Sequence, residues 1–165
     1  MPDSKPFSGS DDPQLREGRR QCFVALYNFN KNAIHPTTSD IERSSLFSHI
    51  IPKENIGMHV EVEAGFHCQY GHYISIGDEV TISENCRILD AGRVTIGARS
   101  LIGPDVSIYT IDGYSEKGHN FPWDKRRCIA KPVVIEEDCW IGGRAPYSGW
   151  SEGWEEQHCQ GWNLR

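Results

Sequence analysis

Isoleucine recurs at every sixth position in the middle of this chain, and no other feature constrains its fold as strongly. The steps of six occur in three runs: Ile76, Ile82 and Ile88; Ile96, Ile102 and Ile108; Ile135 and Ile141. Small or β-branched residues follow several of them four positions later: Val80, Cys86, Ser100, Val106 and Cys139. The chain holds 16 isoleucines but 6 leucines in 165 residues, and β-branched side chains favour strands over helices. We therefore predict that short β-strands build the middle of the chain.

A period of six predicts a triangular prism of stacked coils. Each short strand turns one aliphatic side chain inward and a turn follows it, so that three strands complete one coil. A single coil cannot bury its inner face, whereas stacked coils bury a continuous column of isoleucine. The alternative is a β-sandwich, but its strands recur at about 8–12 residues. We predict a mainly β fold, a parallel β-helix over residues 58–143.

Two interruptions of the period are informative. The step from Ile88 to Ile96 leaves room for a two-residue bulge near Asp90 and Ala91. The step from Ile108 to Ile135 contains a polar loop, Tyr109–Lys131. Long loops in compact repeat folds are usually functional or disordered.

Residues 1–57 are predicted to be helical. Asp12 and Pro13 form a typical N-cap and first helical position. We expect the first helix to end at Asn30–Pro36, and a capping box at Ser39–Glu42 to start a second helix that ends before Pro52. The apolar positions expected to face the core are Leu15, Cys22, Phe23 and Leu26 in the first helix and Ile41, Leu46 and Ile50 in the second.

Composition excludes several classes of protein. A net charge of −6 and a pI of about 5.6 argue against a general nucleic-acid binder. The longest apolar stretch, Phe23–Tyr27, is far shorter than the roughly 20 residues of a membrane helix. Met1–Pro13 lacks the apolar segment of a secretory signal, so we expect a cytoplasmic location. The six cysteines form no CxxC pair and are interpreted as reduced thiols.

Short motifs follow one another along roughly residues 7–143. They are Ser10–Leu15, Tyr27–Asn30, Asn85–Asp90, Val94–Gly97, Leu101–Val106, Lys131–Val133 and Trp140–Gly143. In this order they resemble the maltose and galactoside O-acetyltransferase group of the hexapeptide-repeat acyltransferases. The resemblance implies a left-handed parallel β-helix with an N-terminal helical cap, assembled as a homotrimer with active sites between subunits. It implies acetyl-CoA as co-substrate and a sugar hydroxyl as acceptor, and we expect no metal. From charge and composition we expect no nucleic-acid or membrane partner.

The chemistry of this family needs a general base, because a sugar hydroxyl is a poor nucleophile at neutral pH. The best match for the catalytic base is His119 within Gly118–Asn120, with Arg126 at the family's spacing. This alignment requires extra residues before His119, and without a gap Gly113 occupies the base position. A solvated loop histidine is the alternative interpretation of His119.

The resemblance also implies binding residues. Ser83 stands where the family has an asparagine that orients sugar or base, and Asn85 two positions later matches. Asp11 and Arg19 correspond to acceptor-binding positions in the cap, although an extra residue nearby leaves the place of Asp11 open and Arg19 could equally be a solvated helix charge. Cofactor-binding positions that line the CoA channel correspond to Trp140, Gly142 and Gly143; a coil-capping role is the alternative for Trp140.

Residues 144–165 depart from the family pattern, and three of the five tryptophans lie there. Read one nucleotide forward, every Trp codon followed by any base gives glycine, and the segment becomes another hexapeptide-like turn. We hypothesise a change of reading frame after Gly143 in an apparently truncated chain. A genuine divergent tail is the alternative.

Two other functions remain open. A truncated, non-catalytic hexapeptide protein could act through trimer assembly. A γ-class carbonic anhydrase would need three convergent histidines around zinc, for which His67, His72 and His119 are the candidates.

Overall fold

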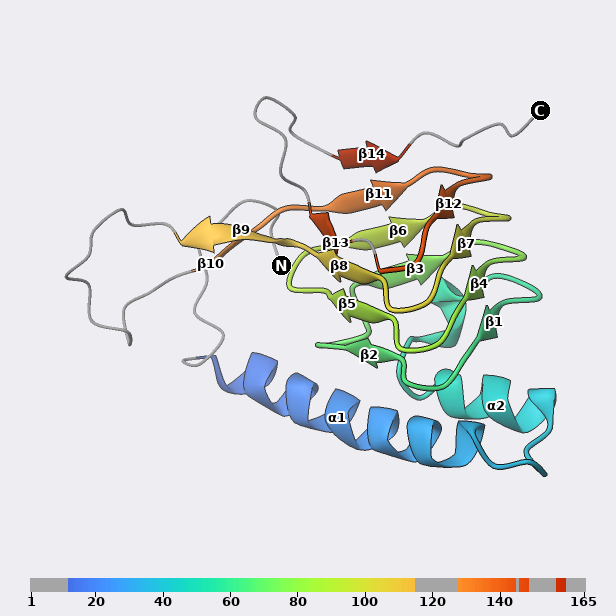
Figure 1. The fold of residues 1–165 in the computed structure, drawn as a ribbon. Helices are drawn as coiled ribbons and strands as arrows, with labels where there is room; N and C mark the ends of the chain where they lie inside the picture. Colours follow the sequence, from blue (N-terminus) through green and yellow to red (C-terminus); the bar gives the residue numbers. More distant parts are fainter. Residues whose placement is uncertain (1–11, 115–127, 145, 149–156, 160–165) are drawn as a thin grey trace.

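A stack of short strands stands on two helices in the computed structural model (Figure 1). The structure describes residues 12–114, 128–144, 146–148 and 157–159. The helices are α1 (Pro13–Ala33) and α2 (Asp40–Phe47), followed by the short 3-10 helix η1 (Lys53–Asn55). Both predicted helix starts are confirmed: Asp12 accepts from the first backbone N–H groups of α1, and Ser39 and Glu42 form the capping box of α2.

The buried face of α1 differs from the predicted one. It consists of Cys22, Leu26, Phe29 and Ala33, whereas Phe23 is 63% exposed. Phe23 lies about 100° around the helix from Cys22, outside this stripe. The helix ends at Ala33, within the predicted segment Asn30–Pro36. Asn30 is still helical, and its side chain donates to Phe66 O and accepts from Gly65 N. In α2, Ile41 is exposed, because only one face of this short helix contacts the core.

Three four-stranded parallel sheets form the sides of a prism. The first contains β1 (Glu61–Val62), β4 (Thr81–Ile82), β7 (Leu101–Ile102) and β12 (Trp140–Ile141). The second contains β3 (Ile74–Ile76), β6 (Val94–Ile96), β11 (Val133–Ile135) and β14 (Gln157–Cys159). The third contains β2 (His67–Cys68), β5 (Arg87–Leu89), β8 (Ser107–Tyr109) and β13 (Pro146–Ser148).

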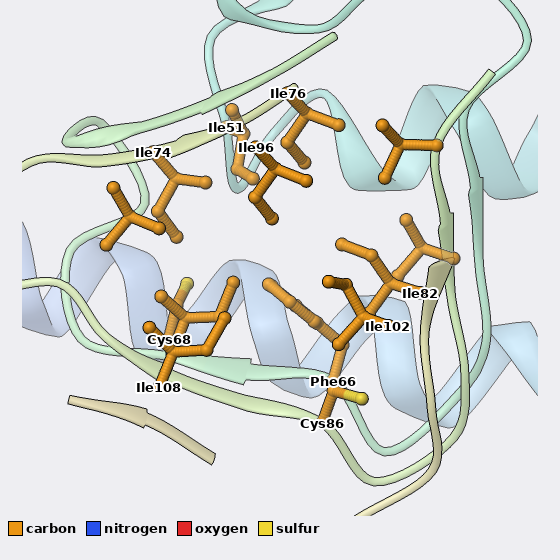
Figure 2. Close-up of a cluster of buried hydrophobic side chains, with 14 of the residues drawn as sticks. Ile51, Phe66, Cys68, Ile74, Ile76, Ile82, Cys86, Ile96, Ile102 and Ile108 are labelled. Carbon is orange, nitrogen blue, oxygen red and sulfur yellow. The ribbon is translucent and has the colours of Figure 1, made fainter. Parts of the chain in front are cut away.

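The predicted isoleucine columns are the core of the prism. Along three successive strands of the second sheet, Ile76 pairs with Ile96 and Ile96 with Ile135. The other columns are Ile82, Ile102 and Ile141 in the first sheet and Ile88 and Ile108 in the third. Figure 2 shows labelled members of the three columns converging from the three sides: Ile76, Ile96, Ile82, Ile102 and Ile108. Parallel pairing between coils confirms the stacked coils and excludes the sandwich.

Turns between strands hold residues in the left-handed backbone region. At one edge these are His59, Glu79, Arg99 and Asp138, and at the next Gly65, Asn85, Asp105 and Arg144. The small residues expected beside the turns, Val80, Cys86, Ser100, Val106 and Cys139, are all buried, as predicted. Each turn repeats the conformation of the turn in the coil beneath it.

The third edge carries the additional residues. Asp90 and Ala91 are buried at the place where the two-residue bulge was predicted. The long loop leaves from the same edge, and its ends pair as the antiparallel strands β9 (Ile111–Tyr114) and β10 (Cys128–Ala130), which project from the prism (Figure 1). His119 lies outside the described residues. Beyond Gly143, β13 pairs with β8 and β14 with β11.

Aromatic rings close the lower end of the core. Phe47 lies between Phe29 of α1 and Phe66 of the first coil, with ring centroids 5.5 and 5.4 Å apart. Among the described cysteine side chains, four are buried and form no disulfide: Cys22, Cys68, Cys86 and Cys139. None of the helices in the described part of the chain is long and apolar enough to cross a membrane.

Candidate functional site

Arg19, a predicted acceptor-binding residue, lies in the first half of α1 over the third edge of the prism. Its Nη2 donates a hydrogen bond of 2.8 Å to the hydroxyl of Tyr70, and its Cζ lies 5.3 Å from the centroid of that ring. This distance is within the range of a cation–π contact. A guanidinium has five N–H donors, and Tyr70 is its hydrogen-bond partner among the described residues. The remaining donors can therefore bind oxygen atoms of a ligand.

An aromatic cluster surrounds this contact. The ring centroid of Tyr70 lies 5.8 Å from those of His72 and Tyr73, and the latter two are 4.0 Å apart. Desolvation lowers the pKa of His72, which favours the neutral form of the imidazole. Burial, followed by the charges of nearby groups that include Asp90 and Asp12, raises the pKa of Tyr73. An arginine beside aromatic rings offers both hydrogen bonds and flat apolar surface, which suits a sugar.

Asp90 is a buried carboxyl group at the same edge, and the sequence analysis did not single it out as functional. Its Oδ1 accepts hydrogen bonds of 2.7 and 2.9 Å from the N–H groups of Gln69 and Tyr70, and its Oδ2 accepts one of 2.7 Å from Gly71. Burial raises the pKa of Asp90 to about 6, against these backbone N–H groups, which lower it. An acidic residue inside the two-residue bulge was the available sequence signal.

Ser83 and Asn85 lie at another edge of the prism, in the turn that follows β4. Ser83 is partly exposed and its N–H donates to Ile102 O. Asn85 has a φ of 60° and an exposed side chain. Its place in the left-handed column is a structural role in the turn, distinct from the predicted substrate contact.

Gly142 and Gly143, two of the predicted CoA-binding positions, occupy that same edge two coils higher. A Cβ on Gly142 would meet no heavy atom within 4 Å, whereas one on Gly143 would lie 3.0 Å from Pro104 O. The backbone at Gly142 is thus open to the approach of a ligand. Trp140 lies just before them on β12, where its side chain is 54% exposed and its Cα pairs with that of Leu101.

The predicted site residues therefore form two groups on one chain. Arg19 lies at the third edge, whereas Ser83, Asn85, Gly142 and Gly143 share the edge that follows the first sheet, with Trp140 beside it. Asp11 and His119 lie outside the described residues, so the structure does not place them. A groove of about 600 Å³ lies between α2 and β1, and none of the predicted site residues lines it.

The described residues also bear on the metal hypothesis. His67 lies on β2 and His72 follows in the next turn, but His119, the third candidate ligand, is not described. Within the described ranges, no three histidine, cysteine or acidic side chains are grouped so that they could hold a metal ion.

Individual relatives match this chain, although no protein-family model does. Nodulation protein L of Rhizobium leguminosarum bv. viciae is 41% identical over 93 residues, which are 54% of this chain and 46% of that protein. A hexapeptide-repeat acetyltransferase of Vibrio cholerae O1 biovar eltor, solved with acetyl-CoA, is 30% identical; the match covers 86% of this chain and 72% of that chain, with a TM-score of 0.71. A galactoside acetyltransferase solved with coenzyme A is 25% identical and covers 88% of this chain and 68% of that chain, with a TM-score of 0.75.

The fold is thus the left-handed parallel β-helix with an N-terminal helical cap that the resemblance implied. The chain belongs to the hexapeptide-repeat acetyltransferases, in the group of the galactoside and maltose O-acetyltransferases. It spans 46% and 53% of the lengths of the two rhizobial nodulation proteins that it matches, about half of each.

Proposed function

We propose that this chain is an acetyl-CoA-dependent O-acetyltransferase that transfers an acetyl group to a hydroxyl of a maltose-, glucose- or galactoside-like sugar. The observation that carries the proposal is the match over 86% of the chain to an acetyltransferase solved with acetyl-CoA. The name of the galactoside acetyltransferase relative supports a sugar acceptor.

His119 is the proposed general base. It takes the proton of the sugar hydroxyl while the hydroxyl oxygen attacks the acetyl carbonyl carbon. The carbon–sulfur bond then breaks, an ester bond remains on the sugar, and the proton passes from the imidazole to the leaving CoA thiolate. A positioned base contributes about 10²–10⁴ in rate, and a backbone N–H near the carbonyl oxygen would stabilise the developing negative charge.

The two groups of residues favour a site shared between subunits. Arg19 binds the acceptor at the third edge, and its docking on Tyr70 supports this role. Asp11 is a second proposed acceptor-binding residue. Ser83 and Asn85 contribute from a neighbouring edge, and Trp140, Gly142 and Gly143 line the channel for acetyl-CoA. Because these edges are separate on one chain, a homotrimer would bring one edge of a subunit against a different edge of the next.

The test is release of free CoA thiol from acetyl-CoA by the purified chain with maltose, glucose or a galactoside. We expect sugar-dependent release, and a loss of about 10²–10⁴ in kcat for His119→Ala. His35→Ala is the matched control, because His35 is an exposed histidine at the C-terminal end of α1, bonded to Thr37.

Size-exclusion chromatography with light scattering shows whether the tested protein has three times the 18.7 kDa chain mass. Folded trimeric protein that releases no thiol with any of the sugars would overturn the proposed activity and favour a non-catalytic assembly role. Full activity in His119→Ala would overturn the assignment of the base alone.

A further inference from the structure

The third edge of the prism is built from a column of residues one coil apart. Leu89 pairs with Tyr109, so the following residues, Asp90 and Thr110, stack above each other. Each of them reaches down to the turn of the coil beneath. Thr110 Oγ1 donates to Leu89 O at 2.6 Å and accepts from Gly92 N at 2.9 Å. Asp90 likewise binds the turn Gln69–Gly71, but its carboxylate only accepts, from the backbone N–H groups of all three residues.

The turn under Asp90, Gln69–Gly71, also contacts the helical cap. The φ of Gly71 is 79°, and a Cβ at Gly71 would collide with Ile50 O, so this backbone lies directly against the end of the helical cap. The side chain of Tyr70, 3% exposed, points from the same turn toward α1 and accepts the hydrogen bond from Arg19. A displacement of this turn would move the phenol and release the guanidinium.

We propose that Asp90 is a positioning residue of the acceptor site, which acts on Arg19 through the Gln69–Gly71 backbone and the hydroxyl of Tyr70. Asp90 does not contact the acceptor. It holds the turn, the turn places the phenol, and the phenol orients the guanidinium toward the sugar. This inference rests on the proposed function, since the acceptor is the group that Arg19 binds.

The chemistry of Asp90 explains why a carboxylate is needed at this position. Both of its oxygens accept, so all three N–H groups are satisfied. An asparagine of the same shape turns one N–H₂ group toward a backbone N–H, which leaves a buried donor without an acceptor. Asp90→Asn therefore loosens the turn with little change in side-chain volume. Tyr70→Phe leaves the turn intact but removes the hydroxyl that accepts the hydrogen bond from Arg19.

The experiment compares acceptor KM in Asp90→Asn, Tyr70→Phe, Arg19→Ala and the double variant Asp90→Asn/Arg19→Ala. We expect the single variants to raise the acceptor KM, roughly tenfold for Asp90→Asn, with the KM for acetyl-CoA and kcat unchanged. Loss of binding that is equal in the ground and transition states changes KM alone. The double variant should match Arg19→Ala, because Asp90 acts only through that residue.

Asn30→Ala is the matched control. Asn30 also ties α1 to the first coil, through Phe66 O at 2.8 Å and Gly65 N at 2.9 Å, but it lies three turns along the helix from Arg19. It should lower the melting temperature without changing the acceptor KM. An Asp90→Asn effect on stability alone, or one that adds fully to Arg19→Ala, would overturn the proposal, and so would a normal KM in Tyr70→Phe.

A second readout separates this proposal from the proposed function. If the wild type shows no sugar-dependent thiol release, the acceptor role of Arg19 is overturned together with that function. Hydrogen exchange then tests whether Asp90 positions Arg19 through the turn. Faster exchange at the amides of Gln69–Gly71 and a changed Arg19 side-chain resonance in Asp90→Asn support this coupling. Unchanged exchange and resonance overturn it.

Discussion

At the scale of single residues, two opposing effects act on the pKa of the Asp90 carboxyl group. Desolvation disfavours its charge, while the N–H groups of Gln69–Gly71 favour it. Desolvation dominates, so the pKa of Asp90 rises from 3.8 to about 6. The folded protein therefore binds this proton more tightly than the unfolded chain does.

This difference predicts a pH dependence of stability. Between about pH 4 and 6 the folded state holds the proton of Asp90 and the unfolded state does not, so the stabilisation from this group is present at low pH and is lost as the pH rises through 6. From pH 7 to pH 4, the wild type should gain roughly 2 kcal/mol of unfolding free energy relative to Asp90→Asn. Urea titrations of both proteins at several pH values measure it; a constant difference would contradict the prediction.

Asn85 allows a structural role to be separated from a substrate contact. Its φ of 60° is costly for a residue with a Cβ and is tolerated by asparagine and glycine. We expect Asn85→Ala to unfold about 1 kcal/mol more easily than Asn85→Gly, as measured by chemical denaturation. If Asn85 also contacts the acceptor, both variants raise the acceptor KM; if only Asn85→Ala is impaired, its role is confined to the turn.

At the scale of elements, a strand is stabilised by its neighbours in the coils above and below. β6 is paired on both sides, with β3 and with β11, and its inward side chains Val94 and Ile96 are 1% exposed. The hairpin β9–β10 is a two-stranded ribbon that projects from the prism (Figure 1). Such ribbons are marginally stable on their own.

Hydrogen exchange should therefore be graded along the chain. The amides of β6 are expected to exchange slowest, near the rate of global unfolding, because opening them breaks two ladders at once. The amides of β9 and β10 should exchange orders of magnitude faster. Amide-resolved exchange by NMR measures both groups, and equal protection would show that the ribbon is stabilised to the same degree as the prism.

The elements differ in how far the sequence predicts them. The isoleucine columns were predictable because the inward direction of Ile76, Ile82 and Ile88 depends only on local spacing. The buried face of α1 was not, because Phe23 and Phe29 compete for the core and the choice depends on where Phe47 and Phe66 lie. Phe29 packs against Phe47, whereas Phe23 is left exposed, so the choice rests on contacts between residues that lie far apart in the sequence.

At the scale of the whole molecule, the candidate site depends on two kinds of long-range order. Stacking places residues one coil apart in contact, as with Asp90 and the turn at Gly71. Docking of the cap adds Arg19, 51 positions before Tyr70 in the chain. A resemblance could suggest Arg19 alone, but the link from Asp90 to Arg19 requires both the coil length and the seating of the helix.

The third edge also determines where such a chain can grow longer. At the other two edges, each turn repeats the backbone of the turn beneath it, so an inserted residue would shift every later column out of phase. At the third edge the two additional residues Asp90 and Ala91 are accommodated inside the stack, and the whole segment between β8 and β11 leaves it and returns in register. New segments, natural or grafted, can therefore be accommodated at this one side of the protein while the hydrophobic interior keeps its order.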